Sequence, residues 1–140
     1  MVVSRDIPAL DLTYKVVQLK SRNDGVRYTA KRSQGKHTIP GRKQVFRRLH
    51  PDGKMIGDVI GIFDETPEGS SQPLLKPVIR DGRLLQPLPS LGSVRRNVSE
   101  RLGRLPKYCR RFTPPFSQHY PVDLSAKILK LNQRLTGGKK

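Results

Sequence analysis

The residues best suited to chemistry stand in one short basic stretch, Gly35–Arg47, which reads GKHTIPGRKQVFR. Glycines, a proline and several cations together suggest a phosphate cradle, a nucleic-acid patch or a loop that leads into a sheet. The P-loop pattern G-x-x-x-x-G-K-[ST] is not met, because five residues separate Gly35 from Gly41 and Arg42 follows the second glycine. The stretch by itself therefore favours a basic loop or hairpin.

Other reactive side chains are too scattered to form a site. The histidines His37, His50 and His119 show none of the spacings that hold a metal ion. Cys109 is the one cysteine, and a lone cysteine at the end of a helical run is more often packed than nucleophilic. The carboxylate pair Asp64–Glu65 lies in a loop-like segment and is interpreted as solvated. The sequence predicts no catalytic residue and no metal ligand.

Charge is the feature that departs most from an ordinary domain. Twenty-eight Lys and Arg residues against 11 Asp and Glu residues give a net charge of +17 in 140 residues, which favours an anionic partner. A small basic nucleic-acid-binding or protein-interaction module is therefore one hypothesis. Aromatic residues are only 6% of the chain, however, and tryptophan is absent. Tyr14, Tyr28 and Phe46 alternate with apolar neighbours and are interpreted as core residues rather than base-stacking platforms.

The chain also lacks the signs of an oxidising or membrane environment. A single cysteine excludes a disulfide framework within the chain. No apolar run approaches the length of a membrane span, and the first residues lack the shape of a signal peptide. We expect a cytoplasmic protein.

Strand-like runs occupy the first part of the chain, residues 12–86. Asp-Gly turns separate successive β-rich runs, which is typical of antiparallel hairpins. The acidic segment 64–73 between the second and third hairpins is predicted to be an exposed loop. The predicted strands form a meander and lie in these segments: Tyr14–Lys20, Val26–Lys31, Lys43–Leu49, Lys54–Phe63, and the flanks of Arg80-Asp81-Gly82.

The period of apolar residues changes in the second part, residues 90–136. Leu91, Val94, Val98, Leu102 and Leu105 recur at steps of three and four, which predicts an amphipathic helix that ends before a proline. A second stripe predicts a last helix that begins after a serine N-cap. The tail 137–140 is basic. We therefore predict one α+β domain over residues 1–140, with strands first and two amphipathic helices last.

The last helix and its cap are defined by a few residues. Ser125 is the predicted N-cap, and Gly137 is placed to end the helix. The apolar stripe between them consists of Leu124, Ile128, Leu131 and Leu135. The segment before the cap, YPVDL, is predicted to be a short strand.

Taken in order, several of these segments resemble the C-terminal part of nicotinate phosphoribosyltransferases. The most specific element combines T-x-P-G-[RK]-K-Q-[VA]-[FY]-R at Thr38–Arg47 with DGKMIGD at Asp52–Asp58. The resemblance covers nearly the whole chain and also rests on DIPALDLTYKVVQL, QPLLKPVIRDGRLLQPLPSL and YPVDLSAKILKLNQRL.

This resemblance implies an accessory domain of a type II phosphoribosyltransferase, an irregular α/β barrel enzyme that is usually dimeric. Such an enzyme couples nicotinate to phosphoribosyl pyrophosphate with ATP hydrolysis and gives nicotinate mononucleotide, on the salvage route of NAD biosynthesis. The family's catalytic histidine, nicotinate-binding groups and glycine-rich phosphate loops are expected before Met1. A truncated gene product, a split-gene subunit and an excised domain are all compatible with the sequence.

The resemblance also sets expectations for sites and partners. The chain alone is expected to be inactive and to hold no cofactor, because ATP and Mg²⁺ would be bound by complete members. The expected partner is the N-terminal barrel part or a dimer mate, and specific nucleic-acid binding is not expected. Electrostatic candidates that would bias the field toward anionic substrates are Lys36, Arg42, Lys43 and Arg47. Apolar surface for the partner is expected at Tyr14, Val16, Val26, Tyr28 and Phe112–Phe116.

Overall fold

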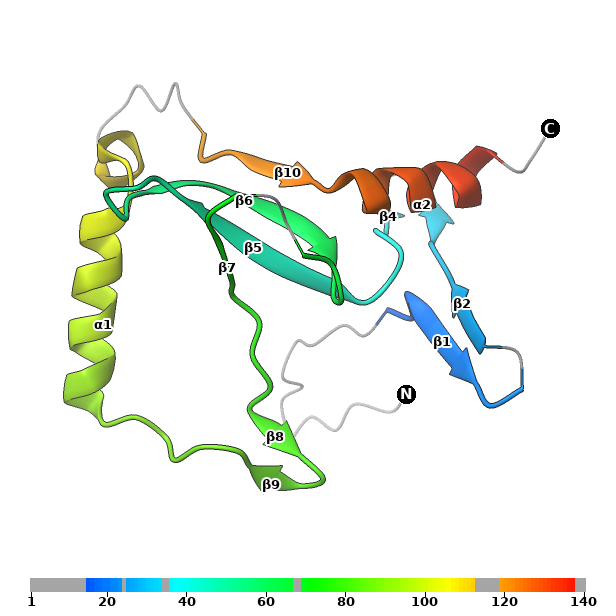
Figure 1. Ribbon diagram of the computed structural model, residues 1–140, viewed down its shortest axis with the longest axis horizontal. Helices are drawn as coiled ribbons and strands as arrows, with labels where there is room; N and C mark the ends of the chain where they lie inside the picture. The colour runs from blue at the N-terminus through cyan, green and yellow to red at the C-terminus, as the bar shows by residue number, and fades with distance from the viewer. Residues whose placement is uncertain (1–14, 24, 34–35, 67–68, 113–118, 138–140) are drawn as a thin grey trace, which may run out of the picture.

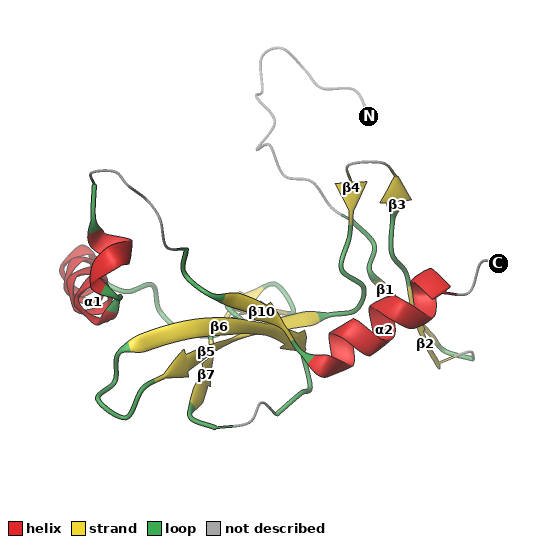
Figure 2. Ribbon diagram, turned by 90° about the horizontal axis from the view of Figure 1, so that it is seen from above, coloured by secondary structure: helices red, strands yellow, loops and turns green. Residues whose placement is uncertain are grey.

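A computed structural model describes residues 15–23, 25–33, 36–66, 69–112 and 119–137. The strands do not form one continuous meander but fall into four small sheets. The largest sheet occupies the centre of the molecule, with helix α1 (Leu91–Arg104) at one end and helix α2 (Ala126–Gly137) at the other (Figures 1 and 2). The predicted α+β class is confirmed.

The central sheet has four strands in the order β10-β6-β5-β7. The long hairpin of β5 (Lys43–Leu49) and β6 (Met55–Ile62) forms the centre of this sheet. The turn of the hairpin contains Gly53 at φ 79°. Glycine suits this position because left-handed backbone costs it nothing. On the outer side of β6, β10 (Val122–Leu124) adds in parallel, so two segments about sixty residues apart in sequence pair directly.

The fourth strand, β7 (Ser71–Pro73), pairs antiparallel with β5. It falls within the segment 64–73 that was predicted to be entirely loop, and that prediction is wrong for these three residues. A short strand of Ser, Gln and Pro carries no apolar alternation, so the local pattern could not indicate it. Proline is tolerated because β7 is an edge strand.

The hydrophobic core is small. Among the described residues, the buried apolar side chains identified as the core are Phe46, Met55 and Ile128, with exposed fractions of 5%, 3% and 0%. Ile128 projects from α2, whose first turn is capped by Ser125 as predicted: its hydroxyl accepts a hydrogen bond from the Ile128 N–H at 3.3 Å. The core therefore joins the β5–β6 hairpin to the last helix.

Two further hairpins lie before the sheet. Strands β1 (Gln18–Ser21) and β2 (Gly25–Tyr28) pair antiparallel, which confirms the first predicted hairpin, and β3 (Arg32–Ser33) pairs with β4 (Lys36–His37). The first hairpin is tied to the start of β5 by the Gly41 N–H, which donates to the Val17 carbonyl at 2.9 Å.

The third hairpin lies apart from the central sheet, whereas the first helix lies beside the end of the sheet that carries the β5–β6 turn. Strands β8 (Ile79–Arg80) and β9 (Arg83–Leu84) form an isolated pair, followed by an extended segment and then α1 (Figure 1). The Ser90 hydroxyl caps α1 by accepting from the Ser93 N–H at 3.2 Å, and a short 3-10 helix, Lys107–Arg110, follows it. The predicted helix is confirmed, but none of its residues is buried.

The apolar surface expected at the first hairpin and the Phe112 turn is found in part. Val16, Val26 and Phe112 are exposed, whereas Tyr28 is half-buried and its ring lies 3.5 Å from the place that a Gly41 Cβ would occupy. Tyr14 and residues 113–116 lie outside the described part of the chain.

Candidate functional site

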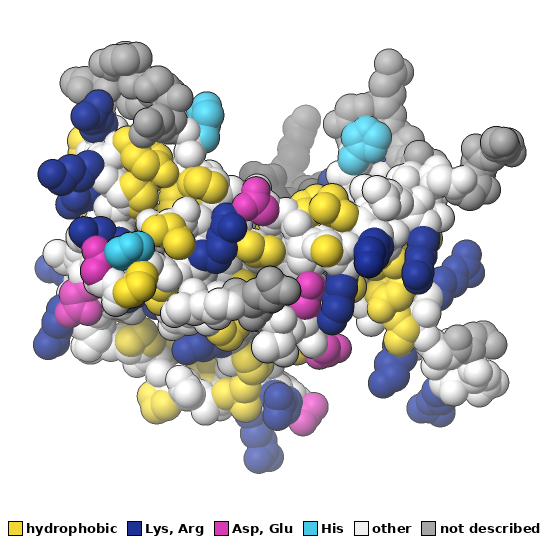
Figure 3. Space-filling view, turned by 45° about the horizontal axis from the view of Figure 1, so that its top comes forward, with side chains coloured by type: hydrophobic (Ala, Val, Ile, Leu, Met, Phe, Trp, Pro, Cys, Tyr) yellow, Lys and Arg dark blue, Asp and Glu magenta, His cyan; other side chains and the backbone are white. Residues whose placement is uncertain are grey.

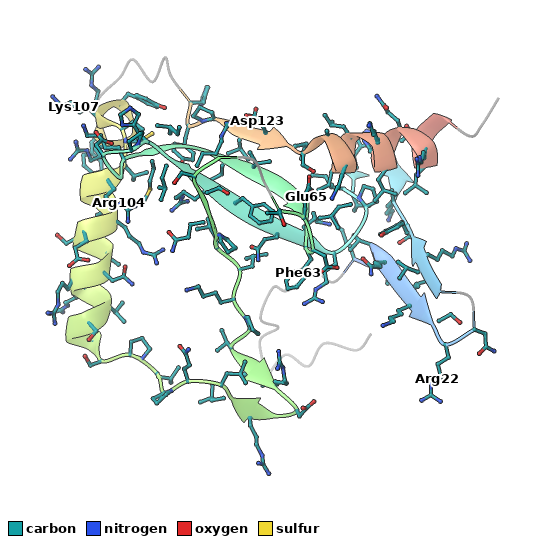
Figure 4. All side chains as sticks on the ribbon, in the orientation of Figure 1. Arg22, Phe63, Glu65, Arg104, Lys107 and Asp123 are labelled. Carbon is teal, nitrogen blue, oxygen red and sulfur yellow. The ribbon has the colours of Figure 1, made fainter. Side chains whose placement is uncertain are left out.

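Three of the four predicted electrostatic residues, Arg42, Lys43 and Arg47, lie at the entrance to β5 and along that strand. Lys36 belongs to β4, and its side chain lies outside what the structure describes. Arg42 is exposed and its guanidinium stacks over the ring of Phe63, 3.5 Å from the centroid. A cation in this position gains from the negative face of the ring and still meets solvent. Phe63 follows β6 and is marked in Figure 4.

Lys43 is used by the loop itself. Its Nζ donates to the carbonyl oxygens of Ile39 at 2.7 Å and Gly41 at 2.8 Å. Partial burial lowers the pKa of the Lys43 ammonium, because a low-dielectric environment disfavours the charged form. Lys43 thus holds the turn at Pro40-Gly41 in shape, and two of its three donors are already engaged with backbone oxygens.

Arg47 forms the most enclosed ion pair among the described residues. Its Nε donates to Asp58 Oδ1 at 3.0 Å and its Nη2 to Asp58 Oδ2 at 2.9 Å, across the β5–β6 ladder. The Tyr120 hydroxyl donates to the same Oδ1 at 3.0 Å. The hydrogen bond from Arg47 to Asp58 raises the guanidinium pKa, and burial followed by the bond to Asp58 raises the pKa of Tyr120. This cluster ties β5 and β6 to the segment before β10.

The structure therefore does not gather the three described cations, Arg42, Lys43 and Arg47, into one site. Lys43 and Arg47 occupy alternate positions on one face of β5, about 13 Å apart at the usual rise of a strand. Each has partners within the chain, and Arg42 stacks on Phe63. On the face shown in Figure 3, Lys and Arg side chains are spread over the whole surface rather than collected in one patch. Their predicted effect, to bias the electrostatic field of the enzyme toward anionic substrates, stays a prediction.

Gln44 is a structural residue that the sequence did not single out. It is buried, with 5% of its surface exposed, and its amide binds both backbone groups of Leu75: Nε2 donates to the carbonyl at 2.9 Å, and Oε1 accepts from the N–H at 2.8 Å. Oε1 also accepts from the Val45 N–H at 2.9 Å. The Gln44 amide thus pairs with the Leu75 main chain as the main chain of a neighbouring strand would. It fixes the position of the chain just after β7.

Glu65 was predicted to be solvated together with Asp64, and for Glu65 this is wrong. Its Oε2 accepts from the Ile62 N–H at 2.9 Å and from the Ser125 hydroxyl at 2.8 Å, so the carboxylate lies between the end of β6 and the start of α2 (Figure 4). A negative charge at a helix N-terminus is stabilised by the helix dipole. Asp64 itself is exposed, as predicted.

The described residues contain no group of three or more His, Cys, Asp and Glu side chains placed to hold a metal ion. His50 pairs with Asp52 at 2.9 Å in the β5–β6 turn, and Cys109 is half-buried in the 3-10 helix. No helix in the part of the chain that the structure describes is both long and apolar enough to cross a membrane. The His50–Asp52 pair thus belongs to the β5–β6 turn.

The arrangement is that of a small α+β domain with few buried apolar side chains and many exposed ones among the described residues. Comparison with known proteins defines the class further. Residues 68–132 match the family model of the nicotinate phosphoribosyltransferase C-terminal domain. This match includes β7, both outlying elements β8–β9 and α1, and most of α2.

Curated relatives extend the match over nearly the whole chain. The nicotinate phosphoribosyltransferase pncB2 of Mycobacterium tuberculosis is 38% identical over 130 residues, which are 92% of this chain and 26% of the relative. The enzyme from Bos taurus is 31% identical and the one from Homo sapiens 29% identical, each covered to 27%. The crystal structure of human nicotinic acid phosphoribosyltransferase superimposes with a TM-score of 0.65 and 26% identity over 80% of this chain and 27% of that one.

The chain is therefore related to the C-terminal part of nicotinate phosphoribosyltransferases, as its sequence predicted. It spans about a quarter of the length of the relatives that it matches. The fold of an accessory domain, predicted from the same resemblance, is confirmed by the match to the human structure.

Proposed function

We propose that this chain serves as the C-terminal accessory domain of a nicotinate phosphoribosyltransferase. The enzyme would join nicotinate to phosphoribosyl pyrophosphate with ATP hydrolysis and so supply nicotinate mononucleotide to NAD biosynthesis. The observation that carries the proposal is the 38% identity to pncB2 over 92% of the chain. We further propose that the domain works in the cytoplasm.

Chemistry at the ribose carbon requires both reactants to be positioned and the diphosphate to be neutralised as it leaves. Two of the cations predicted to influence an anion, Lys43 and Arg47, are already engaged with groups of the chain itself. The reaction, together with binding of ATP and Mg²⁺, would therefore belong to the remaining three quarters of the enzyme. The accessory domain would add structural support and a positive field, since the chain carries a net charge of +17.

A domain replacement tests the proposal. The C-terminal quarter of the mycobacterial relative is exchanged for this chain, and pyrophosphate release is measured with nicotinate, phosphoribosyl pyrophosphate, ATP and Mg²⁺. We expect the hybrid to turn over, and we expect two controls to stay at the blank: this chain alone, and the relative truncated before its C-terminal quarter. A soluble, folded hybrid without turnover would contradict the proposal, as would turnover by the isolated chain.

A further inference from the structure

The segment from Leu75 to Gly103, which we name the arm, has a defined fold but no core of its own. It contains the hairpin β8–β9 and helix α1, yet every residue in it is exposed. Its large apolar side chains are between 40% and 74% exposed: Leu75, Val78, Ile79, Leu84, Leu85, Leu88, Leu91, Val94, Val98 and Leu102. An isolated two-stranded hairpin and a single exposed helix are marginal in water, so the arm needs a surface to pack on.

The orientation of helix α1 shows on which side of the arm the partner surface would lie. Its polar side chains Asn97, Glu100, Arg101 and Arg104 line a pocket of about 150 Å³ together with residues of the sheet, among them Met55. Arg104 also donates from Nε to the Gly53 carbonyl at 2.8 Å, in the β5–β6 turn (Figure 4). The helix thus turns polar groups toward its own domain.

The apolar stripe of α1 points elsewhere. At 100° per residue, the stripe formed by Leu91, Val94, Val98 and Leu102 lies about a third of a turn away from the face that lines the pocket. The sequence predicted this stripe from its spacing, and in the structure none of its residues is buried. The helix has its apolar face in solvent and its polar face toward its own sheet. An exposed apolar face of this kind is typical of a surface that binds another protein domain.

We propose that the arm is the docking element of this chain and that its partner is the remaining three quarters of the phosphoribosyltransferase. This rests on the function proposed above. The partner is chosen because the relatives are about four times as long as the matched segment, and because the arm lies within the residues, 68–132, that match the family's C-terminal domain.

Charge argues against a second copy of this chain as the partner. The arm carries six cations, Lys76, Arg80, Arg83, Arg95, Arg96 and Arg101, against two acids, Asp81 and Glu100. Two copies of a chain with a net charge of +17 would bring like charges together along this surface. The surface that fits the arm is apolar at its centre and acidic at its rim.

Hydrogen exchange of the hybrid enzyme tests the docking. Amides of α1 and β8–β9 are compared between the isolated chain and the hybrid, with β5–β6 as the internal reference. We expect the arm amides to exchange at least tenfold more slowly in the hybrid, whereas β5–β6 changes little. Arm amides that exchange equally fast in both would overturn the docking proposal, even in an active hybrid. Protected arm amides in an inactive hybrid would support docking and contradict the proposed function alone.

A second measurement on the full chain does not depend on the hybrid. Binding of a hydrophobic dye is compared between the chain, the stripe variant Val98→Lys/Leu102→Lys, and Ser99→Lys, which adds charge to the same helix off the stripe and the pocket. We expect dye fluorescence to fall by at least half in the stripe variant and to persist in Ser99→Lys. Unchanged fluorescence in the stripe variant would overturn the assignment of the apolar surface. Self-association of the chain that Val98→Lys abolishes would overturn the choice of partner in favour of a second copy.

Discussion

Arg47 and Asp58 face each other across strands β5 and β6 and form a two-point ion pair, with both N–O distances at or below 3.0 Å. The side chains are only 19% and 11% exposed, and Tyr120 completes the hydrogen bonding of Asp58. Two-point pairs of this kind are directional, and removing one partner leaves an enclosed charge unpaired. The pair is therefore expected to contribute to stability rather than to bind a substrate.

The first prediction concerns this pair. Asp58→Asn should lower the free energy of unfolding by about 2 kcal/mol, because Arg47 loses a charged acceptor in a largely buried position. Urea unfolding followed by circular dichroism measures the change. Asp123→Asn is the matched control, since the Arg48–Asp123 pair is 37% and 59% exposed and should be worth less than about 1 kcal/mol. Equal losses in the two variants would contradict the argument.

A second prediction concerns the Gln44 amide. Gln44→Glu keeps the acceptor for the Leu75 N–H but replaces the donor with a carboxylate oxygen facing the Leu75 carbonyl. Because the site is buried, this variant should be destabilised by about 2 kcal/mol or more, and more than Gln44→Met, which is apolar and of similar length. Urea unfolding of both variants makes the comparison. A Gln44→Glu variant as stable as the wild type would show that the Gln44 amide does not form these two hydrogen bonds with Leu75.

The third prediction concerns the junction of β6 and α2. Ser125→Ala should cost about 1 kcal/mol, because the Ile128 N–H loses its cap and Glu65 loses one of its two donors. Ser125→Asp offers a carboxylate at the same cap but places it beside Glu65, so it should not restore stability. Thermal melts of the two variants test this. Full rescue by Ser125→Asp would contradict the role given to Glu65.

A fourth prediction concerns pH. Hydrogen bonds from the Lys54 ammonium and backbone, followed by the one from His50, hold the pKa of Asp52 far below its usual value of 3.8. A depressed folded-state pKa contributes stability above the unfolded value, and this contribution is lost as the pH falls through the folded one. Between pH 5 and pH 2, Asp52→Asn should therefore lose less stability than the wild type. Identical slopes in acid urea titrations would contradict the turn's electrostatic role.

The fifth prediction separates an accessory domain from a nucleic-acid-binding module. Basic side chains that are spread over a face, as on the one in Figure 3, should give only weak, sequence-independent contacts with phosphates. Binding to random duplex DNA should therefore fall steeply with added salt and be lost at physiological ionic strength, as measured by fluorescence anisotropy. Tight binding to a particular sequence or RNA structure at that salt would favour the module instead.

The local sequence pattern predicted elements whose residues repeat regularly. The hairpin of β5 and β6, both helices and the Ser125 cap followed from apolar period and turn residues. Pairings between distant segments could not be predicted this way. The segment YPVDL was predicted to be a strand and forms β10, but its parallel pairing with β6 across about sixty residues was not predicted. Strand β7 has a polar sequence and so leaves no local signature.

The candidate site was predicted less well than the fold. The number of cations in Gly35–Arg47 suggested a positive electrostatic field that favours anionic substrates. The sequence could not show that Lys43 binds its own loop or that Arg47 pairs with Asp58. Similarly, the stripe on α1 was evident from its spacing, while its direction was not. Periodicity says that a helix has an apolar face and leaves open whether its own domain covers that face.

The central claim is that the arm joins this domain to the catalytic part of a nicotinate phosphoribosyltransferase, and pyrophosphate release by the hybrid enzyme with single arm substitutions tests it most directly. Val98→Lys places a charge in the exposed apolar stripe, and Ser99→Lys places the same charge on the next residue, outside the stripe. The account predicts that Val98→Lys lowers the rate of pyrophosphate release at least tenfold and that Ser99→Lys stays within twofold of the unsubstituted hybrid. Equal rates for the two variants would contradict it.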